Sequence, residues 1–319
     1  MSGGVPFLPE SASTIAGEFN ILFAGLLAIT GAVLGLVFLL LFRFCAHYRR
    51  GNDAADRGHW GRKSWRWEVG WTTASFVVFL GLYAWGADLY LREHRWPSNA
   101  TDIYVVGKQW MWKVEHPDGQ REINALHVAL NRPVRLVMTS QDVIHSFFVP
   151  AFRLKQDVVP GRYVSLWFDP TRIGDYHLYC AQFCGTDHAA MGGMVSVLSD
   201  ADYQKWLAAN ATGGTLAAQG GVLYRKLGCA GCHETGATVH APKLAGLYGS
   251  AVTLRNGSTA LADEGFIRSA ILQPAQNVPT GYAPIMPSFV GQLNEEQVMS
   301  LVAYIKSLGA KPAAGSPSR

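Results

Sequence analysis

Residues 180–191 read Cys180-Ala-Gln-Phe-Cys184-Gly-Thr-Asp-His188-Ala-Ala-Met191, and this is the most informative stretch of the chain. It brings two thiols, an imidazole and a thioether together, and these are the soft and borderline ligands that select copper. Short apolar or alternating segments, typical of β-strands, surround it at 103–106, 110–114, 134–138, 163–168, 176–179 and 194–198. Many short strands without helices between them predict an all-β Greek-key barrel or sandwich within residues 93–212.

The residue types in this loop predict a copper site that transfers electrons. A single-copper site needs one Cys, two His and a weak axial Met. Cys184, His188 and Met191 follow the order that such loops use, and His145 can come from an earlier strand. Cys180 is an additional thiol, and two thiolates four residues apart can bridge two copper ions. We therefore predict a binuclear site whose ligands are His145, Cys180, the backbone carbonyl of Gln182, Cys184, His188 and Met191.

A copper chaperone or a disulfide would account for these cysteines less well. A Cys-x-x-x-Cys pair also occurs in copper chaperones of thioredoxin-like fold, but those proteins do not place a His and a Met so close behind the second Cys. Disulfides are disfavoured because a correctly spaced His follows each cysteine pair. His116, His127 and His177 each lie alone on or beside a predicted strand, and no metal is expected there. Cys45 has no companion and is predicted to be an inert buried thiol.

A second cluster, Cys229-Ala-Gly-Cys232-His233, has the spacing that attaches a c-type haem. Two thioether bonds would hold the haem, and His233 would be the proximal iron ligand. A structural zinc site would need a second ligand pair, which does not follow. The distal ligand is expected to be Met286, which lies in a proline-flanked loop, with His240 as the competing candidate.

The end of the chain predicts a helix and a tail. Asn294 and Gln297 make a capping-box pattern, and Gly309 closes the helical pattern that follows. Met299 lies beside the apolar stripe of that helix, so we expect it in the core and not on the iron. The sequence therefore predicts an all-α domain over residues 213–319 that ends in a disordered Pro/Gly/Ser tail.

Two uncharged apolar runs, 21–42 and 69–87, are each long enough to cross a bilayer. They predict a transmembrane hairpin within residues 1–92. A cleaved signal peptide is the weaker alternative, because the first run lacks a basic segment before it. Seven Lys and Arg residues lie between the runs, at Arg43, Arg49, Arg50, Arg57, Arg62, Lys63 and Arg66. The positive-inside rule places this loop in the cytoplasm, and both termini and the metal-binding domains outside it.

The composition of the 319-residue chain fits two or three folded domains, with 49% apolar residues and a net charge of +4. The basic excess is concentrated in the short loop between the apolar runs. A basic surface for nucleic acid is therefore not expected.

Three motifs resemble subunit II of the haem–copper cytochrome c oxidases: residues 142–150, residues 155–162, and the Cys-x-x-x-Cys-x-x-x-His-x-x-Met loop. The resemblance covers roughly residues 19–200 and implies a two-helix membrane hairpin followed by a cupredoxin domain with a binuclear CuA centre. Residues 219–309 are similar to a class I cytochrome c domain. By the same resemblance, Trp110 takes the position of the tryptophan at which electrons enter; a packed barrel aromatic is the alternative. The family often has Glu where this chain has Gln182, a change that keeps the carbonyl ligand but puts the family's magnesium site at the subunit I interface in question.

The resemblance implies a function in respiratory electron transport. The chain would be the subunit through which electrons enter a bacterial, proton-translocating cytochrome c oxidase, passing from haem c to CuA and then to haem in subunit I, where dioxygen is reduced to water. Its expected partners are subunits I and III, a cytochrome c or similar periplasmic donor, and the plasma-membrane bilayer. Two alternatives remain open: the corresponding subunit of a CuA-containing nitric oxide reductase, and a membrane-anchored copper or redox assembly protein.

Overall fold

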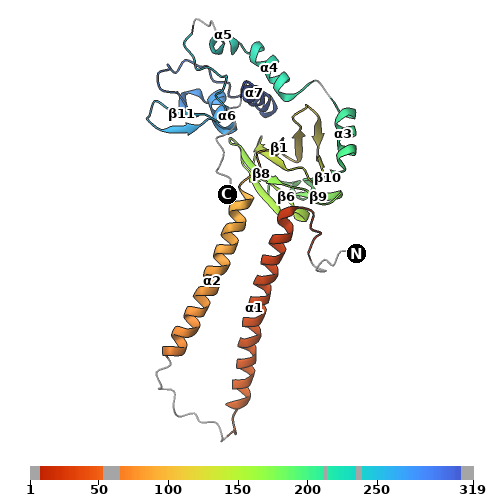
Figure 1. Ribbon diagram of the computed structural model, residues 1–319, viewed down its shortest axis with the longest axis vertical. Helices are drawn as coiled ribbons and strands as arrows, with labels where there is room; N and C mark the ends of the chain where they lie inside the picture. Colours follow the sequence, from red (N-terminus) through yellow and green to blue (C-terminus); the bar gives the residue numbers. More distant parts are fainter. Residues whose placement is uncertain (1–7, 53–64, 212–213, 235–238, 310–319) are drawn as a thin grey trace. The chain divides into compact units, whose positions relative to one another are not determined.

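The computed structural model describes residues 8–52, 65–211, 214–234 and 239–309, which belong to two compact units (Figure 1). One unit contains residues 14–95, and the other contains the residues up to Ser13 together with those from Trp96 onward. Three predicted basic-loop residues, Arg57, Arg62 and Lys63, and the tail from Lys311 lie outside the described residues.

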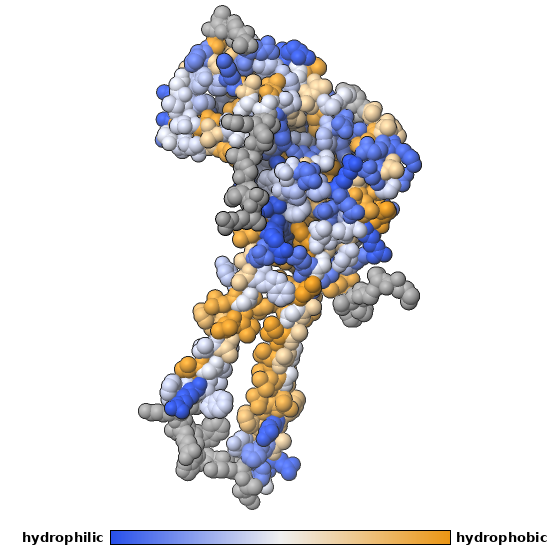
Figure 2. All heavy atoms as spheres, viewed as in Figure 1, coloured by the Kyte–Doolittle hydropathy of each residue, from blue (hydrophilic) through white to orange (hydrophobic). Residues whose placement is uncertain are grey.

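The first unit consists of two long helices, α1 (Thr14–His47) and α2 (Trp65–Glu93). They contain both predicted apolar runs, and hydrophobic residues cover much of their length (Figure 2). At 34 and 29 residues, both exceed the roughly 20 residues that cross a bilayer. Glu18 and Arg92 form a 2.7 Å ion pair between the two helices. The prediction that Cys45 is buried is wrong: it is exposed, because it lies on α1, most of whose side chains are exposed. Because most of their apolar side chains are exposed, the helices are suited to a lipid environment and support membrane anchoring of the chain.

The second unit begins with a β-sandwich made of two five-stranded sheets, which have the strand orders β3-β2-β1-β5-β8 and β4-β10-β9-β6-β7. The strands are β1 (Thr101–Lys108), β2 (Met111–Glu115), β3 (Arg121–Ile123), β4 (Ala125–Ala129), β5 (Val134–Ser140), β6 (His145–Val149), β7 (Leu154–Val158), β8 (Val164–Phe168), β9 (Gly174–Cys180) and β10 (Gly192–Leu198). Large buried side chains, among them Trp112, Phe147, Phe152 and Phe168, fill the space between the sheets. This architecture confirms the cupredoxin-like fold.

Strand β1 is apolar on both faces. Alternate residues of a strand point to opposite faces. Ile103 and Val105 belong to the core of the sandwich, whereas Tyr104 and Val106 are buried in a separate cluster on the outer face of the sheet. An outer sheet face that is buried in this way must be covered by another part of the chain.

The segment before α1 completes the sandwich. The backbone N–H of Ala12 donates to Ala151, and its carbonyl accepts from Thr171, both at 2.9 Å. Ala12 is fully buried in the sandwich core. Residues 8–13 therefore belong structurally with the strands.

The regular structure in the remaining described residues is mostly helical. Helix α3 (Asp200–Ala209) begins at the N-cap Ser199, and the helical domain then consists of α4 (Leu216–Lys226), α5 (Ala230–His233), α6 (Glu264–Leu272) and α7 (Glu295–Ser307), with a small hairpin of β11 (Ala251–Thr253) and β12 (Thr259–Leu261). The capping box predicted at Asn294 and Gln297 is confirmed: each residue's side chain accepts from the other's backbone N–H, at 2.9 and 3.0 Å.

Helices α4 and α7 cross at a contact that only glycine permits. A Cβ placed on Gly220 would lie 1.9 Å from the carbonyl oxygen of Ser300, closer than any real contact. At Gly221 it would lie 3.0 Å from the ring of Tyr304, which is a side-chain contact. Because glycine has no Cβ, the backbones of α4 and α7 can approach each other closely at these two positions.

Candidate functional site

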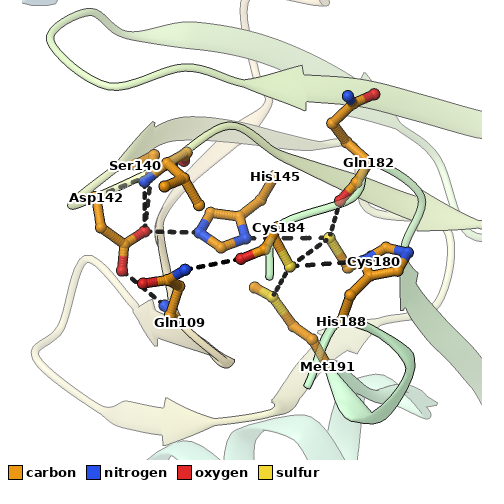
Figure 3. Close-up of polar contacts among 10 residues, drawn as sticks. Gln109, Ser140, Asp142, His145, Cys180, Gln182, Cys184, His188 and Met191 are labelled. Carbon is orange, nitrogen blue, oxygen red and sulfur yellow. Dashed lines mark hydrogen bonds and ion pairs between the residues drawn. The ribbon is translucent and has the colours of Figure 1, made fainter. Parts of the chain in front are cut away.

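The predicted copper ligands converge at one end of the sandwich (Figure 3). His145 begins β6, Cys180 ends β9, and the following loop carries Cys184, His188 and Met191. The two cysteine Sγ atoms lie 3.8 Å apart, and Cys184 Sγ lies 3.5 Å from His188 Nδ1 and 3.7 Å from Met191 Sδ. Cys180 Sγ lies 4.0 Å from His145 Nδ1. Three further donors, two imidazoles and a thioether, are therefore gathered around the pair of thiol sulfurs.

Burial and chemistry both suit this cluster to a metal. His145, Cys180, Cys184 and Met191 are all buried, and the ligand atoms of the first three lie within 4.8 Å of one another. The cysteines are free thiols, since a disulfide would hold the sulfurs about 2.05 Å apart. Burying such a group of donors is unfavourable unless protons or metal ions satisfy it.

The two thiols have opposite pKa shifts. Burial alone would raise the pKa of Cys180, but the hydrogen bond with His145 and the contacts with nearby backbone groups outweigh it and lower this pKa to about 6. Burial and the neighbouring sulfur of Cys180 raise the pKa of Cys184 to about 12. The pair therefore holds one proton near neutral pH. A metal that displaces this proton gains two thiolate ligands.

A second layer of hydrogen bonds holds the cluster in place. Asp142 Oδ1 lies 2.8 Å from Nε2 of His145, which leaves Nδ1 turned toward Cys180. The other carboxylate oxygen of Asp142 accepts from the backbone N–H of Gln109 at 2.7 Å, and the Gln109 side chain donates to the carbonyl of Cys184 at 2.8 Å. Neither Asp142 nor Gln109 is predicted as a site residue from the sequence. The signal for Asp142 is its place three residues before His145.

Gly107 makes room for the histidine. A Cβ at this position would lie 2.9 Å from Cδ2 of His145 and 3.2 Å from the Trp112 ring. Since Trp112 is fully buried and contacts His145 edge to face, neither ring has space to move. The glycine therefore lets the imidazole lie against the sheet.

The remaining predicted residues lie at the edge of the cluster or away from it. The Gln182 carbonyl oxygen is 3.2 Å from Cys180 Sγ, while its side chain points away (Figure 3). Trp110 is partly buried and lies beside Gly185, in the loop between Cys184 and His188. His116 and His127 are not part of the cluster: both contact the carboxylate of Glu122, at 2.8 and 2.5 Å.

The second predicted site is a cavity of about 350 Å³ in the helical domain. Cys229, Cys232, His233 and Met286 all line it, as does His240. Most of the other lining residues are apolar, including Leu227, Leu244, Phe266, Ile271, Phe289, Leu301 and Ile305. An apolar cavity bordered by the Cys-x-x-Cys-His motif suits a flat macrocycle that is held covalently at one edge.

Of the residues considered as iron ligands, His233, Met286 and His240 line the cavity. Nδ1 of His233 lies 2.8 Å from the carbonyl oxygen of Pro242, and because a carbonyl can only accept, Nδ1 carries the proton and Nε2 remains free for a metal. Met286 and His240 both face the cavity, and His240 stacks on Tyr282 at 4.7 Å. Met299 does not line this cavity. It is buried against the outer face of the sandwich, as a core residue.

The fold and the two sites define a class: a membrane-anchored electron-transfer protein with a copper-type cupredoxin domain and a c-type cytochrome domain. Residues 121–198 match the family described as cytochrome C oxidase subunit II, periplasmic domain, and residues 217–309 match the cytochrome c family. Subunit 2 of the cytochrome c oxidase of Cereibacter sphaeroides is 30% identical over 256 residues, covering 67% of this chain and 82% of that one. The chain belongs to the cytochrome c oxidase subunit II family.

Similar proteins from further bacteria carry related names. The alternative cytochrome c oxidase subunit 2 of Bradyrhizobium diazoefficiens is 29% identical over 62% of this chain and 82% of its own length. Subunit 2 from Alkalihalophilus pseudofirmus is 27% identical over 86% of this chain and 82% of its own. The crystal structure of the periplasmic domain of subunit II from Bradyrhizobium japonicum is 30% identical, with a TM-score of 0.35 over 36% of this chain and 96% of that one.

Family membership makes this chain part of a haem–copper oxidoreductase and implies association with other oxidase subunits. The cytochrome c domain supports a haem c, and the subunit II domain implies copper of the CuA type. The periplasmic domain supports an extracytoplasmic location for the sandwich.

Proposed function

We propose that this chain is the subunit through which electrons enter a bacterial cytochrome c oxidase of the plasma membrane. It would accept electrons from a periplasmic donor such as cytochrome c and pass them through its haem and copper sites to haem in subunit I, for reduction of dioxygen to water. Subunits I and III would be its partners. The observation that supports this most strongly is the convergence of two thiols, two imidazoles and a thioether in a chain that also carries a haem-type cavity.

At the copper site, Cys180 and Cys184 would bridge two copper ions, with His145 on one copper and His188 on the other. Met191 and the Gln182 carbonyl would be the weak outer ligands. The donor set suits copper, and the 3.8 Å sulfur separation suits two shared ions. Gln182 offers no carboxylate at this position, so we assign it no magnesium role.

At the haem site, Cys229 and Cys232 would form the thioether bonds, His233 would be the proximal ligand and Met286 the distal one. When bound, the haem iron and the copper pair take up and release single electrons, which is redox chemistry that these side chains do not supply themselves.

The chain's own contribution is to position both groups and to keep water away. Asp142 fixes the ring of His145, and the hydrogen bond to Pro242 fixes the ring of His233. Burial of Cys180, Cys184 and Met191 limits rearrangement when the charge of the site changes. We propose Trp110, beside the copper-site loop, as the residue at which electrons from an external donor would enter.

The test is to purify the complex through a tag on this chain and supply a reduced cytochrome c. We expect dioxygen consumption, and reoxidation of the haem c absorption band on the same timescale. A Cys180→Ser variant should keep the haem band but lose turnover. If the wild-type complex consumes nitric oxide and not dioxygen, the oxidase assignment is wrong. If full turnover persists in the variant, electrons do not pass through the copper site.

A further inference from the structure

The helical domain covers the outer face of the sheet that contains β1 and β5. Tyr104, Val106 and Val137 point outward from these strands, and all three are buried. Leu216 of α4 and Met299 of α7 bury them, and each of these is 1% exposed. This is the cover that the apolar outer face of β1 requires. The contact lies within one compact unit.

A group of charged side chains that pair with one another lies beside this apolar contact. Glu264, at the start of α6, is 5% exposed and accepts from Arg135 of β5 at 2.8 Å. The same carboxylate oxygen lies 3.1 Å from Lys306 of α7 and accepts from the Tyr248 hydroxyl at 2.5 Å. Lys306 also pairs with Asp102 of β1. One buried carboxylate of the helical domain thus joins a cation of the sandwich to a cation of its own domain.

A second charged contact joins the helical domain to the segment around Gly161. Arg268 of α6 pairs with Glu295 of α7 and donates to the carbonyl of Gly161 at 2.5 Å. The neighbouring Pro160 forms a β-bridge with Ser140, whose hydroxyl lies 3.4 Å from the carboxylate of Asp142. The contact therefore ends on the segment that supports the carboxylate holding His145.

We propose that the haem-binding domain is fixed in one orientation on the outer face of β1 and β5, with Glu264 and Arg268 as the positioning residues for electron transfer between the two sites. This inference rests on the proposed function. Buried charges are destabilising unless their partners are correctly placed, so they favour one arrangement over its alternatives. The short segment between α3 and α4 is then a covalent connection and not a tether on which the domain searches for its partner.

Fixed docking and tethered searching respond differently to linker length. On a flexible tether, effective concentration falls roughly as the −3/2 power of linker length, so a fivefold longer linker slows transfer about tenfold. In the docked arrangement, the first-order rate of electron transfer from the flash-reduced haem to the copper site should change by less than about twofold when the linker is lengthened. The experiment inserts Gly-Ser residues between α3 and α4 of the full, metal-loaded chain. It follows the absorption band of the haem and that of the copper site. A tenfold loss in the wild-type background would overturn the proposal.

The positioning role is tested by combining the long linker with Glu264→Gln. In this variant transfer should become linker-dependent, slowing several-fold with the long linker but much less with the native one. A residue with only a structural role would lower stability or metal content without creating this dependence. The matched control is Glu296→Gln, because the Glu296–Lys113 pair crosses the same interface but is about one-third exposed. Exposed pairs contribute little, so the control should stay independent of linker length.

Hydrogen exchange and the copper and haem content distinguish failure of the docking proposal from failure of the proposed function. Hydrogen exchange of β1 and α7 should speed up in Glu264→Gln but not in Glu296→Gln, independently of any redox activity. Unchanged exchange would count against the role of Glu264. If Glu264→Gln does not fold, the linker series in the wild-type chain alone decides the proposal. If the wild-type chain fails to bind both copper and haem, the proposed function fails; if it binds both and the rate follows linker length, only fixed docking fails.

Discussion

Oδ1 of Asp142 lies 2.8 Å from Nε2 of His145, so a single carboxylate fixes which nitrogen of the buried histidine faces the cysteines. The pKa of Asp142 is lowered because its hydrogen bonds with the Gln109 backbone and with His145 outweigh the effect of burial. The carboxylate is therefore ionised and accepts the Nε2 proton at neutral pH. Nδ1 of His145 is then the nitrogen turned toward Cys180.

Replacing Asp142 with alanine should weaken copper binding. Loss of a partner that orients a metal-binding histidine typically lowers affinity by about 10- to 100-fold. Competition titration against a copper chelator measures this directly. The control is Asp187→Ala, which removes an exposed carboxylate of the copper-site loop itself, directly before His188, whose side chain makes no cap hydrogen bond. Equal affinity in the two variants would show that Asp142 does not orient His145.

Replacing Met286 with alanine should open the distal position of the haem. Met286 and His240 both line the cavity, but only one can be the iron ligand. We expect the reduced Met286→Ala protein to bind carbon monoxide, with the change followed in the haem absorption spectrum. His240→Ala should remain low-spin and unreactive. The reverse pattern would make His240 the ligand.

Replacing Gly220 with alanine should destabilise the helical domain. The added Cβ would meet the Ser300 carbonyl at 1.9 Å, and this backbone atom cannot turn aside. Overpacking of this kind costs about 1–3 kcal/mol or more in the free energy of unfolding. Gly221→Ala is the matched comparison, because its Cβ would meet the side-chain ring of Tyr304 at 3.0 Å and no backbone atom at closer range. Denaturant unfolding followed by the haem band should rank Gly220→Ala as clearly the weaker protein; equal stabilities would contradict the helix crossing.

The interdomain carboxylate should make stability fall in acid. Burial alone would raise the pKa of Glu264, but Arg135 and Lys306 outweigh it and lower this pKa to about 2, from an ordinary value of 4.5. A lowered carboxylate pKa stabilises the folded state above the ordinary value, and the contribution is lost as the pH falls from about 4.5 to about 2. The difference corresponds to about 3 kcal/mol. Glu122, also lowered to about 2, titrates in the same window.

The contribution of Glu264 is therefore measured as the difference between wild type and Glu264→Gln. Their free energies of unfolding should differ at pH 6 and converge towards pH 2. A constant difference across this range would contradict the ionised carboxylate.

Local spacing explains what the sequence could predict. Cys180, Cys184, His188 and Met191 lie on one short loop, so any compact fold of that loop brings them together. The capping box at Asn294 is local in the same sense, since its two partners are three residues apart. The apolar runs of α1 and α2 need no tertiary contact to be recognised.

The interdomain contact is different because its partners are far apart in the chain. Arg135 and Glu264 are separated by 129 positions, and Lys306 and Asp102 by 204. Nothing in the local pattern pairs them. The local sequence pattern predicts only a short connection between the two domains. The buried contacts between them follow from the apolar outer face of β1. That face can be recognised only once the strand order of the sheet is known. In the same way, Gln109 acts through a hydrogen bond to the carbonyl of Cys184, which lies 75 positions further along the chain.

The most direct test of the central claim is the copper-to-iron ratio of the full-length, fully haem-loaded chain, read together with its electron paramagnetic resonance spectrum. Bridging by Cys180 and Cys184 predicts two coppers for each iron, hyperfine structure from two equivalent copper nuclei, and loss of that signal in Cys180→Ser. One copper per iron, or a two-copper signal that survives in the variant, would contradict the account.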